Sequence, residues 1–105
     1  MKIILAKEMK AVKEPWTPID LARVNDHIVR MALFKGEYLW HSHKEDEMFL
    51  VAKGKITIEM KKGKSIRLSR NEIAVVPKGI AHRTRSDKGA YVLMFEPSAL
   101  KSKGD

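Results

Sequence analysis

Short segments in which apolar and polar residues alternate make up most of this 105-residue chain. Alternation with a period of two is typical of β-strands that have one buried and one exposed face. Turn-forming residues, among them Asn25-Asp26 and Gly54, separate the segments at intervals of about ten residues, which is typical of an all-β sandwich or barrel. The predicted strands are residues 19–24, 27–34, 38–43, 47–53, 56–60, 65–68, 73–76, 82–85 and 91–95.

Three segments depart from this alternation. Residues 2–13 carry spaced apolar positions among Lys and Glu, and fit a short strand followed by a helical turn, either of which could dominate. Two prolines exclude regular structure between Glu14 and Pro18, and we expect Trp16 to pack over an open edge or end of the barrel. Residues 73–76 are apolar throughout, which predicts a strand that is buried on both faces.

The length predicts one domain, residues 1–105, with a barrel core at about residues 19–97. The absence of cysteine excludes disulfides, zinc fingers and iron–sulfur clusters, so any metal must be held by histidines and carboxylates. The segment Met1–Glu8 lacks the apolar core of a signal peptide, and no apolar stretch approaches the ~18 residues of a membrane span. We therefore expect a soluble, cytoplasmic protein.

The formal net charge is +8. A basic chain can attract nucleic acid, or it can carry lysines on a solvated surface. We favour the solvated surface, because no basic run is interleaved with aromatic residues as in a platform for stacking bases. Charged residues make up 32% of a chain without glutamine, a combination that resembles proteins of heat-loving organisms.

His41 and His43 are separated by one residue, so on a strand their side chains point to the same side. Glu47 follows just past a short turn, and His82 comes after the bend at residues 77–79. Imidazole suits zinc, copper, iron and nickel, and a carboxylate adds manganese. His41 and His43 could instead lie on the exposed polar face of a strand, but the company of Glu47 and His82 favours a metal site.

These residues lie in two motifs that together resemble the signature of the cupin family. The first reads Gly36, four residues, His41-Ser42-His43, three residues, Glu47, six residues, Gly54. The second reads Pro77-Lys78-Gly79, two residues, His82. The chain departs from the family pattern at three points. Four residues rather than five separate Gly36 from His41. Asn71 stands in place of a glycine, and Ser86 in place of an asparagine. No departure affects a proposed ligand.

The resemblance implies an all-β jelly-roll barrel, also called a double-stranded β-helix. It implies one divalent transition metal (iron, zinc, nickel or manganese) held by His41, His43, Glu47 and His82. Cupins commonly form homodimers by pairing edge strands or exchanging N-terminal segments, and residues 1–12 are candidates for such an exchange. The metal would act as a Lewis acid or oxygen activator in a dioxygenase, isomerase or epimerase, with no general base assigned.

Aromatic and apolar residues near the motifs have two interpretations. Phe49 and Val51 share parity with Glu47 and are candidates, with Tyr38, for lining the pocket. They could equally pack in the core or at a dimer interface. Trp40 has the opposite parity to His41, so we expect it to face outward.

Polar residues near the motifs are similarly ambiguous. Glu45 and Asp46 are either acceptors for the N–H of a ligand histidine or exposed loop charges. Arg83 and Arg85 either contact an anionic substrate or are solvated side chains, and solvation is the simpler interpretation on a basic chain. His27 matches no motif position, so we expect it on the surface.

The sequence leaves three functional hypotheses open. The first is a metal-dependent enzyme acting on a small molecule. The second is a non-catalytic cupin module that binds a sugar, a metal or a metabolite. The third is a nucleic-acid-associated protein, which is the least favoured because no DNA-reading helix is visible.

Overall fold

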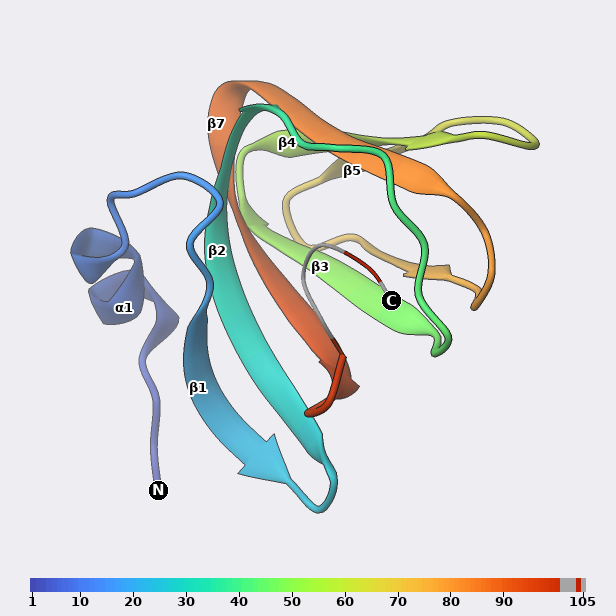
Figure 1. The fold of residues 1–105 in the computed structure, drawn as a ribbon. Coiled ribbons are helices and arrows are strands. Elements are labelled where there is room, and N and C mark those ends of the chain that lie inside the picture. The colour runs from blue at the N-terminus through green and yellow to red at the C-terminus, as the bar shows by residue number, and fades with distance from the viewer. Residues whose placement is uncertain (101–103, 105) are drawn as a thin grey trace.

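Seven antiparallel strands form one strongly curved sheet, and a short helix lies outside it (Figure 1). The computed structural model describes residues 1–100 and 104. The elements are α1 (Leu5–Ala11), β1 (Ile19–Val24), β2 (His27–Glu37), β3 (Glu47–Lys53), β4 (Lys55–Met60), β5 (Ile66–Ser69), β6 (Ile73–Val76) and β7 (His82–Pro97). No helix of the described residues is long and apolar enough to cross a membrane.

The long strand β7 joins the two halves of the sheet. Its first residues pair with β4, as in Thr57 opposite Arg85, and its last residues pair with both β2 and β3. The register against β2 shifts between Phe34 and Gly36, where β7 bends over the top of the molecule (Figure 1). The sheet order is β1-β2-β7-β3-β6, with β5 paired to β4. The curvature brings inward-facing side chains of both halves together.

Two apolar clusters stabilise this arrangement. The larger fills the inside of the curved sheet with residues such as Phe49, Val51 and Val92. The smaller lies on the outside, where Met9 and Val12 from the N-terminal segment cover Met31 and its neighbours on β1, β2 and β7. Burial of apolar surface contributes about 25 cal/mol per Å², so both clusters favour the folded chain.

Several expected elements differ from the structure. Residues 2–13, for which the sequence leaves both a short strand and a helical turn open, contain the helix α1 and no strand. The predicted strand 38–43 is wrong: only His41 forms a bridge, opposite His82, and the segment otherwise runs irregularly beside β7. The two separate strands 82–85 and 91–95 are one strand, β7, in which residues 87–89 form the bend.

The prediction that residues 73–76 are buried on both faces is wrong. Ile73 and Val75 are 57% and 52% exposed, whereas Val76 is buried. Within the described part of the chain, β6 pairs only with β3 and lies at the edge of the sheet, so alternate side chains face away from the core. Just before it, Asn71 adopts a positive φ of 68°, a conformation that asparagine tolerates and that glycine adopts freely.

Candidate metal centre

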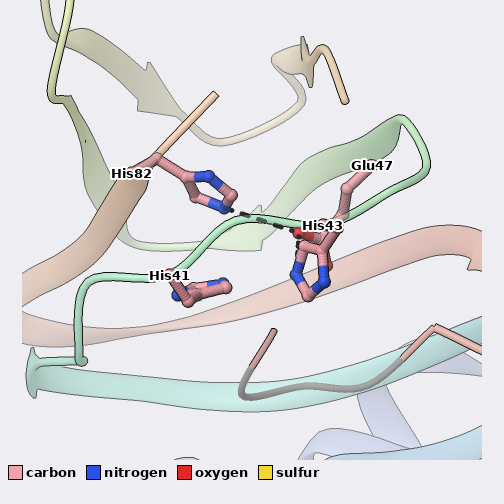
Figure 2. A group of neighbouring side chains, drawn as sticks. All are labelled: His41, His43, Glu47 and His82. Atoms are coloured by element: carbon pink, nitrogen blue, oxygen red, sulfur yellow. Dashed lines mark ion pairs between the residues drawn. The ribbon is translucent and has the colours of Figure 1, made fainter. Parts of the chain in front are cut away.

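Three histidines and one glutamate converge inside the curved sheet (Figure 2). One ligand atom from each of His41, His43, Glu47 and His82 lies within 4.8 Å of the others. His43, Glu47 and His82 are buried, and His41 is partly buried. Glu47 Oε1 lies 3.4 Å from His43 Nε2 and 3.7 Å from His82 Nε2, so the donors surround one small volume.

Three separate segments place these side chains. Glu47 is the first residue of β3 and His82 the first of β7, whereas the other two histidines lie in the irregular segment before β3. His41 and His82 exchange two backbone hydrogen bonds, of 3.0 and 2.9 Å. The N–H of Gly79 donates to the carbonyl of His43 at 2.8 Å, which ties the bend before β7 to the histidine segment.

Backbone carbonyls orient two of the imidazoles. His41 Nδ1 lies 2.9 Å from the carbonyl oxygen of Leu39, and His82 Nδ1 lies 2.9 Å from that of Ile80. Each Nδ1 can only donate to a carbonyl, which leaves Nε2 unprotonated in the neutral ring and available to a metal. Such contacts are the usual supports of metal-binding histidines.

The remaining polar atoms lack partners among the described residues. Both ring nitrogens of His43, Oε1 of Glu47 and Nε2 of His82 are buried without a hydrogen bond. Buried polar atoms are normally satisfied, and leaving them unpaired costs about 1–3 kcal/mol each. Burial also lowers the pKa of His41, which favours its neutral form. The donor set therefore fits a divalent transition metal.

A second carboxyl group, that of Glu96 on β7, lies against Glu47. Burial raises the pKa of Glu47, but contacts with His43, His82 and Glu96 lower it overall. Burial and the contact with Glu47 raise the pKa of Glu96. Arg30 Nη1 donates to Glu96 Oε1 at 2.8 Å. One guanidinium group therefore lies beside the buried pair of carboxyl groups.

A cavity of about 290 Å³ opens beside the cluster. His41 and Glu47 form part of its wall, and Arg30 and Glu96 form another part. Its apolar lining consists mainly of aromatic side chains and Met94. The aromatic residues of the wall are Trp16, Phe34, Tyr38 and Phe49. A cavity of this size suits a small organic molecule.

Two of the three predicted pocket residues line this cavity, namely Phe49 and Tyr38. Val51 does not: it lies two residues further into β3, fully buried in the apolar core. Trp16 stacks against Tyr38 with ring centroids 4.8 Å apart, so the residue expected at an open end of the barrel forms part of the cavity wall. Trp40 is 38% exposed, outside the cavity, beneath Lys61.

The charged candidates have structural partners. Arg83 and Arg85 pair with Glu59 and do not line the cavity beside the histidines, so the structure favours their interpretation as surface residues. Asp46 accepts a hydrogen bond of 2.9 Å from the backbone N–H of Lys78 and thereby joins the histidine loop to the bend before β7. Glu45 is exposed.

Sequence reasoning missed Arg30 and Glu96 as members of this site. Glu96 continues the inward parity of Val92 and Met94, which is a usable signal, but a charged residue next to a proline resembles the end of a strand. His27 lies outside the metal cluster, next to Asp26 and Phe95.

Residues 29–96 match the sequence profile of the cupin domain. The chain belongs to the cupin family. It is 45% identical over 76 residues to YdbB, an uncharacterised protein of Bacillus subtilis, and the match spans 71% of this chain and 67% of that protein. The cupin β-barrel predicted from the two motifs is confirmed.

Solved structures agree with this assignment. A cupin-2 domain protein from Shewanella frigidimarina superimposes with a TM-score of 0.87 at 28% identity, covering 90% of this chain and 93% of that one. A protein from Neisseria meningitidis gives 0.86 at 31% identity, covering 93% and 100%. Hydroquinone 1,2-dioxygenase from a Sphingomonas species, with 4-hydroxybenzoate bound, gives 0.80 at 18% identity, covering 92% and 73%.

Proposed function

We propose that this cupin holds one divalent transition metal through His41, His43, Glu47 and His82 and acts there on a small organic molecule. The observation that carries the proposal is the set of buried, unpartnered donor atoms in the wall of a cavity. Three imidazoles and one carboxylate leave one or two positions open on a five- or six-coordinate metal. When bound, the metal would supply Lewis-acid or oxygen-activating chemistry.

The protein's own residues bind and orient the substrate. Phe34, Phe49 and Trp16 offer apolar surface to a small molecule and exclude water from the metal side of the cavity. The carbonyls of Leu39 and Ile80 hold the rings of His41 and His82 in fixed tautomers. The histidine cluster therefore needs little rearrangement to receive a metal.

The family connection leaves the reaction open, because cupins of one fold carry out unrelated chemistries. The hydroquinone dioxygenase neighbour is only 18% identical, so it supports the fold alone. Dioxygenase, isomerase and epimerase chemistry all use a metal with open positions and stay predictions. The second candidate function is a binding module that holds a metabolite or sugar in the same cavity without turning it over.

Elemental analysis tests the metal centre first. The protein should be purified without a His tag or a chelating resin, beside the variant His43→Leu. We expect close to one equivalent of iron, zinc, nickel or manganese in the native protein and a large loss in the variant. Absence of metal, with none taken up on soaking, would contradict the proposal.

Substrate screens then separate the enzyme from the binding module. Iron in the protein directs the screen to oxygen uptake with small hydroxylated organic molecules, and zinc, nickel or manganese directs it to isomerisation or epimerisation. Product formation that is lost in His43→Leu supports an enzyme. Tight ligand binding by the metal-loaded protein without product, across these screens, supports the binding module.

The homodimer also stays a proposal, and we place its contact on the edge strand β6. Ile73 and Val75 expose apolar surface there, and the free backbone of β6 can pair with the same strand of a second copy about a two-fold axis. Ile73→Lys should shift the native protein from dimer to monomer in analytical ultracentrifugation. A native monomer would refute this contact. The cytoplasmic location and thermophilic origin stay predictions.

A further inference from the structure

Glu96 occupies a position where a carboxyl group is costly. Met48 on β3 pairs with Phe95 on β7, so the next inward positions place Glu47 directly opposite Glu96. Both side chains are buried, at 4% and 3% exposure, and the two carboxyl groups are in contact. Like charges opposed across strands are destabilising, and burial increases the cost. Packing alone gives no reason for a second carboxyl group here.

Arg30 fixes Glu96 in this position. Its guanidinium donates 2.8 Å to Glu96 Oε1, 3.1 Å to Asp20 Oδ1, and 3.2 and 3.1 Å to the carbonyls of Leu100 and Ser98. These bonds draw on the five N–H groups that an arginine can donate. Arg30 is therefore held by β1, by β7 and by the residues after β7. Its hydrogen bond to Glu96 in turn keeps the Glu96 carboxyl group beside Glu47.

The histidines hold Glu47 less firmly. Glu47 Oε1 lies 3.4 and 3.7 Å from the nearest nitrogens of His43 and His82, beyond the 2.7–3.2 Å of an ordinary N–H···O hydrogen bond. No described residue donates a hydrogen bond to Oε1. Glu96, opposite Glu47 across the strand pair, is thus a further constraint on the carboxyl group that would complete the metal site.

We propose that Glu96, braced by Arg30, is a positioning residue that orients the Glu47 carboxylate towards the three histidines. The inference rests on the proposed metal site and assigns a role to a residue outside the four ligands. Contacts beyond the ligands commonly change metal affinity by about 10–100-fold, because they fix the rotamer and the free oxygen of a ligand carboxylate. Glu96 itself donates no ligand atom to the cluster.

The test compares Glu96→Leu with Glu96→Gln, measuring zinc affinity by chelator competition and the visible absorption spectrum of the cobalt(II)-loaded protein. Glu96→Leu should weaken zinc binding by about 10–100-fold and alter the cobalt spectrum, because Glu47 loses its support. Glu96→Gln should restore both to near the native values, because its amide can contact Glu47 and accept from Arg30. A purely structural residue would change stability but not the spectrum.

Two further variants complete the design. Phe95→Leu changes the neighbouring position of β7, whose side chain lies against His27 outside the cavity, and should leave affinity and spectrum unchanged. If Glu96→Leu does not fold because Arg30 loses its buried partner, Arg30→Met/Glu96→Leu replaces the ion pair with an apolar pair. This double variant should show the same loss of affinity as Glu96→Leu.

The inference would be overturned if folded Glu96→Leu, or the double variant, kept an unchanged cobalt spectrum and a zinc affinity within about threefold of native. A change in affinity that small is below the usual effect of a residue that supports a metal ligand. A Glu96→Gln variant as weak as Glu96→Leu would also overturn it, because charge rather than position would then matter. Failure of the proposed function is distinguishable: the native protein would bind no zinc, or His43→Leu would retain it.

Discussion

Replacing His43 with leucine should change stability in opposite directions with and without metal. Both ring nitrogens of His43 are buried without hydrogen bonds to any described residue, and its side chain is 2% exposed. Each unpaired buried group costs about 1–3 kcal/mol, and the contact from Nε2 to Glu47 offsets part of this. Leucine fills a similar volume, so we expect metal-free His43→Leu to be about 1–2 kcal/mol more stable than the native protein.

Zinc reverses this order. A metal that binds only the folded protein adds about 2.7 kcal/mol at 100 times its Kd and about 4.1 kcal/mol at 1,000 times. About 1 kcal/mol shifts Tm by roughly 4–8 °C in a domain close to this size, so the native protein should gain roughly 11–33 °C under these conditions. His43→Leu should gain almost nothing, because one of the four donors is missing.

Urea and thermal unfolding, each with EDTA or with excess zinc, measure both effects. His27→Leu is the matched control, since His27 lies outside the cluster, and its zinc response should equal that of the native protein. A full zinc response in His43→Leu would place the metal elsewhere. A metal-free His43→Leu that is less stable by more than about 2 kcal/mol would show that the metal-free cluster already satisfies its polar atoms.

Two more substitutions probe the elements around the site. Gly54→Ala should lower the free energy of unfolding by about 1–3 kcal/mol in urea titrations. Gly54 has a φ of 90°, and an added Cβ would lie 2.6 Å from the carbonyl oxygen of Gly89. A loss below about 0.5 kcal/mol would contradict this prediction. Asp46→Ala should weaken zinc binding by about tenfold in chelator competition, because the bend before His82 loses its hydrogen bond to the histidine loop. The exposed Glu45→Ala should not weaken it, and equal losses in the two variants would refute the role of Asp46.

The sequence predicts the positions of most strands, because alternation reports which face of a strand is buried. It fails where partners outside the strand decide the result. Nothing local to residues 73–76 shows that β6 lies at an edge, so its apolar run resembles a core strand. Similarly, His41 pairs with His82 far along the chain, and this long-range bridge holds an otherwise irregular segment in place.

The grouping of the four proposed ligands can be predicted from sequence because their spacing is local, apart from His82. The role of Glu96 is not, because it depends on the register between β3 and β7 and on Arg30 from a third strand. Val51 is predicted to line the pocket and does not. Its parity correctly places the side chain inside the sheet, but its position further along β3 puts it in the apolar core rather than in the cavity wall.

The positions of the two tryptophans give the protein a natural optical probe. Trp16 lies in the cavity wall, donates from Nε1 to the carbonyl of Lys35 at 2.9 Å and stacks on Tyr38, so its emission should respond to any molecule or quenching metal that enters. Trp40 reports from the outer surface instead. Trp40→Phe would therefore leave a single emitter inside the cavity and allow ligand screening in solution without any attached dye.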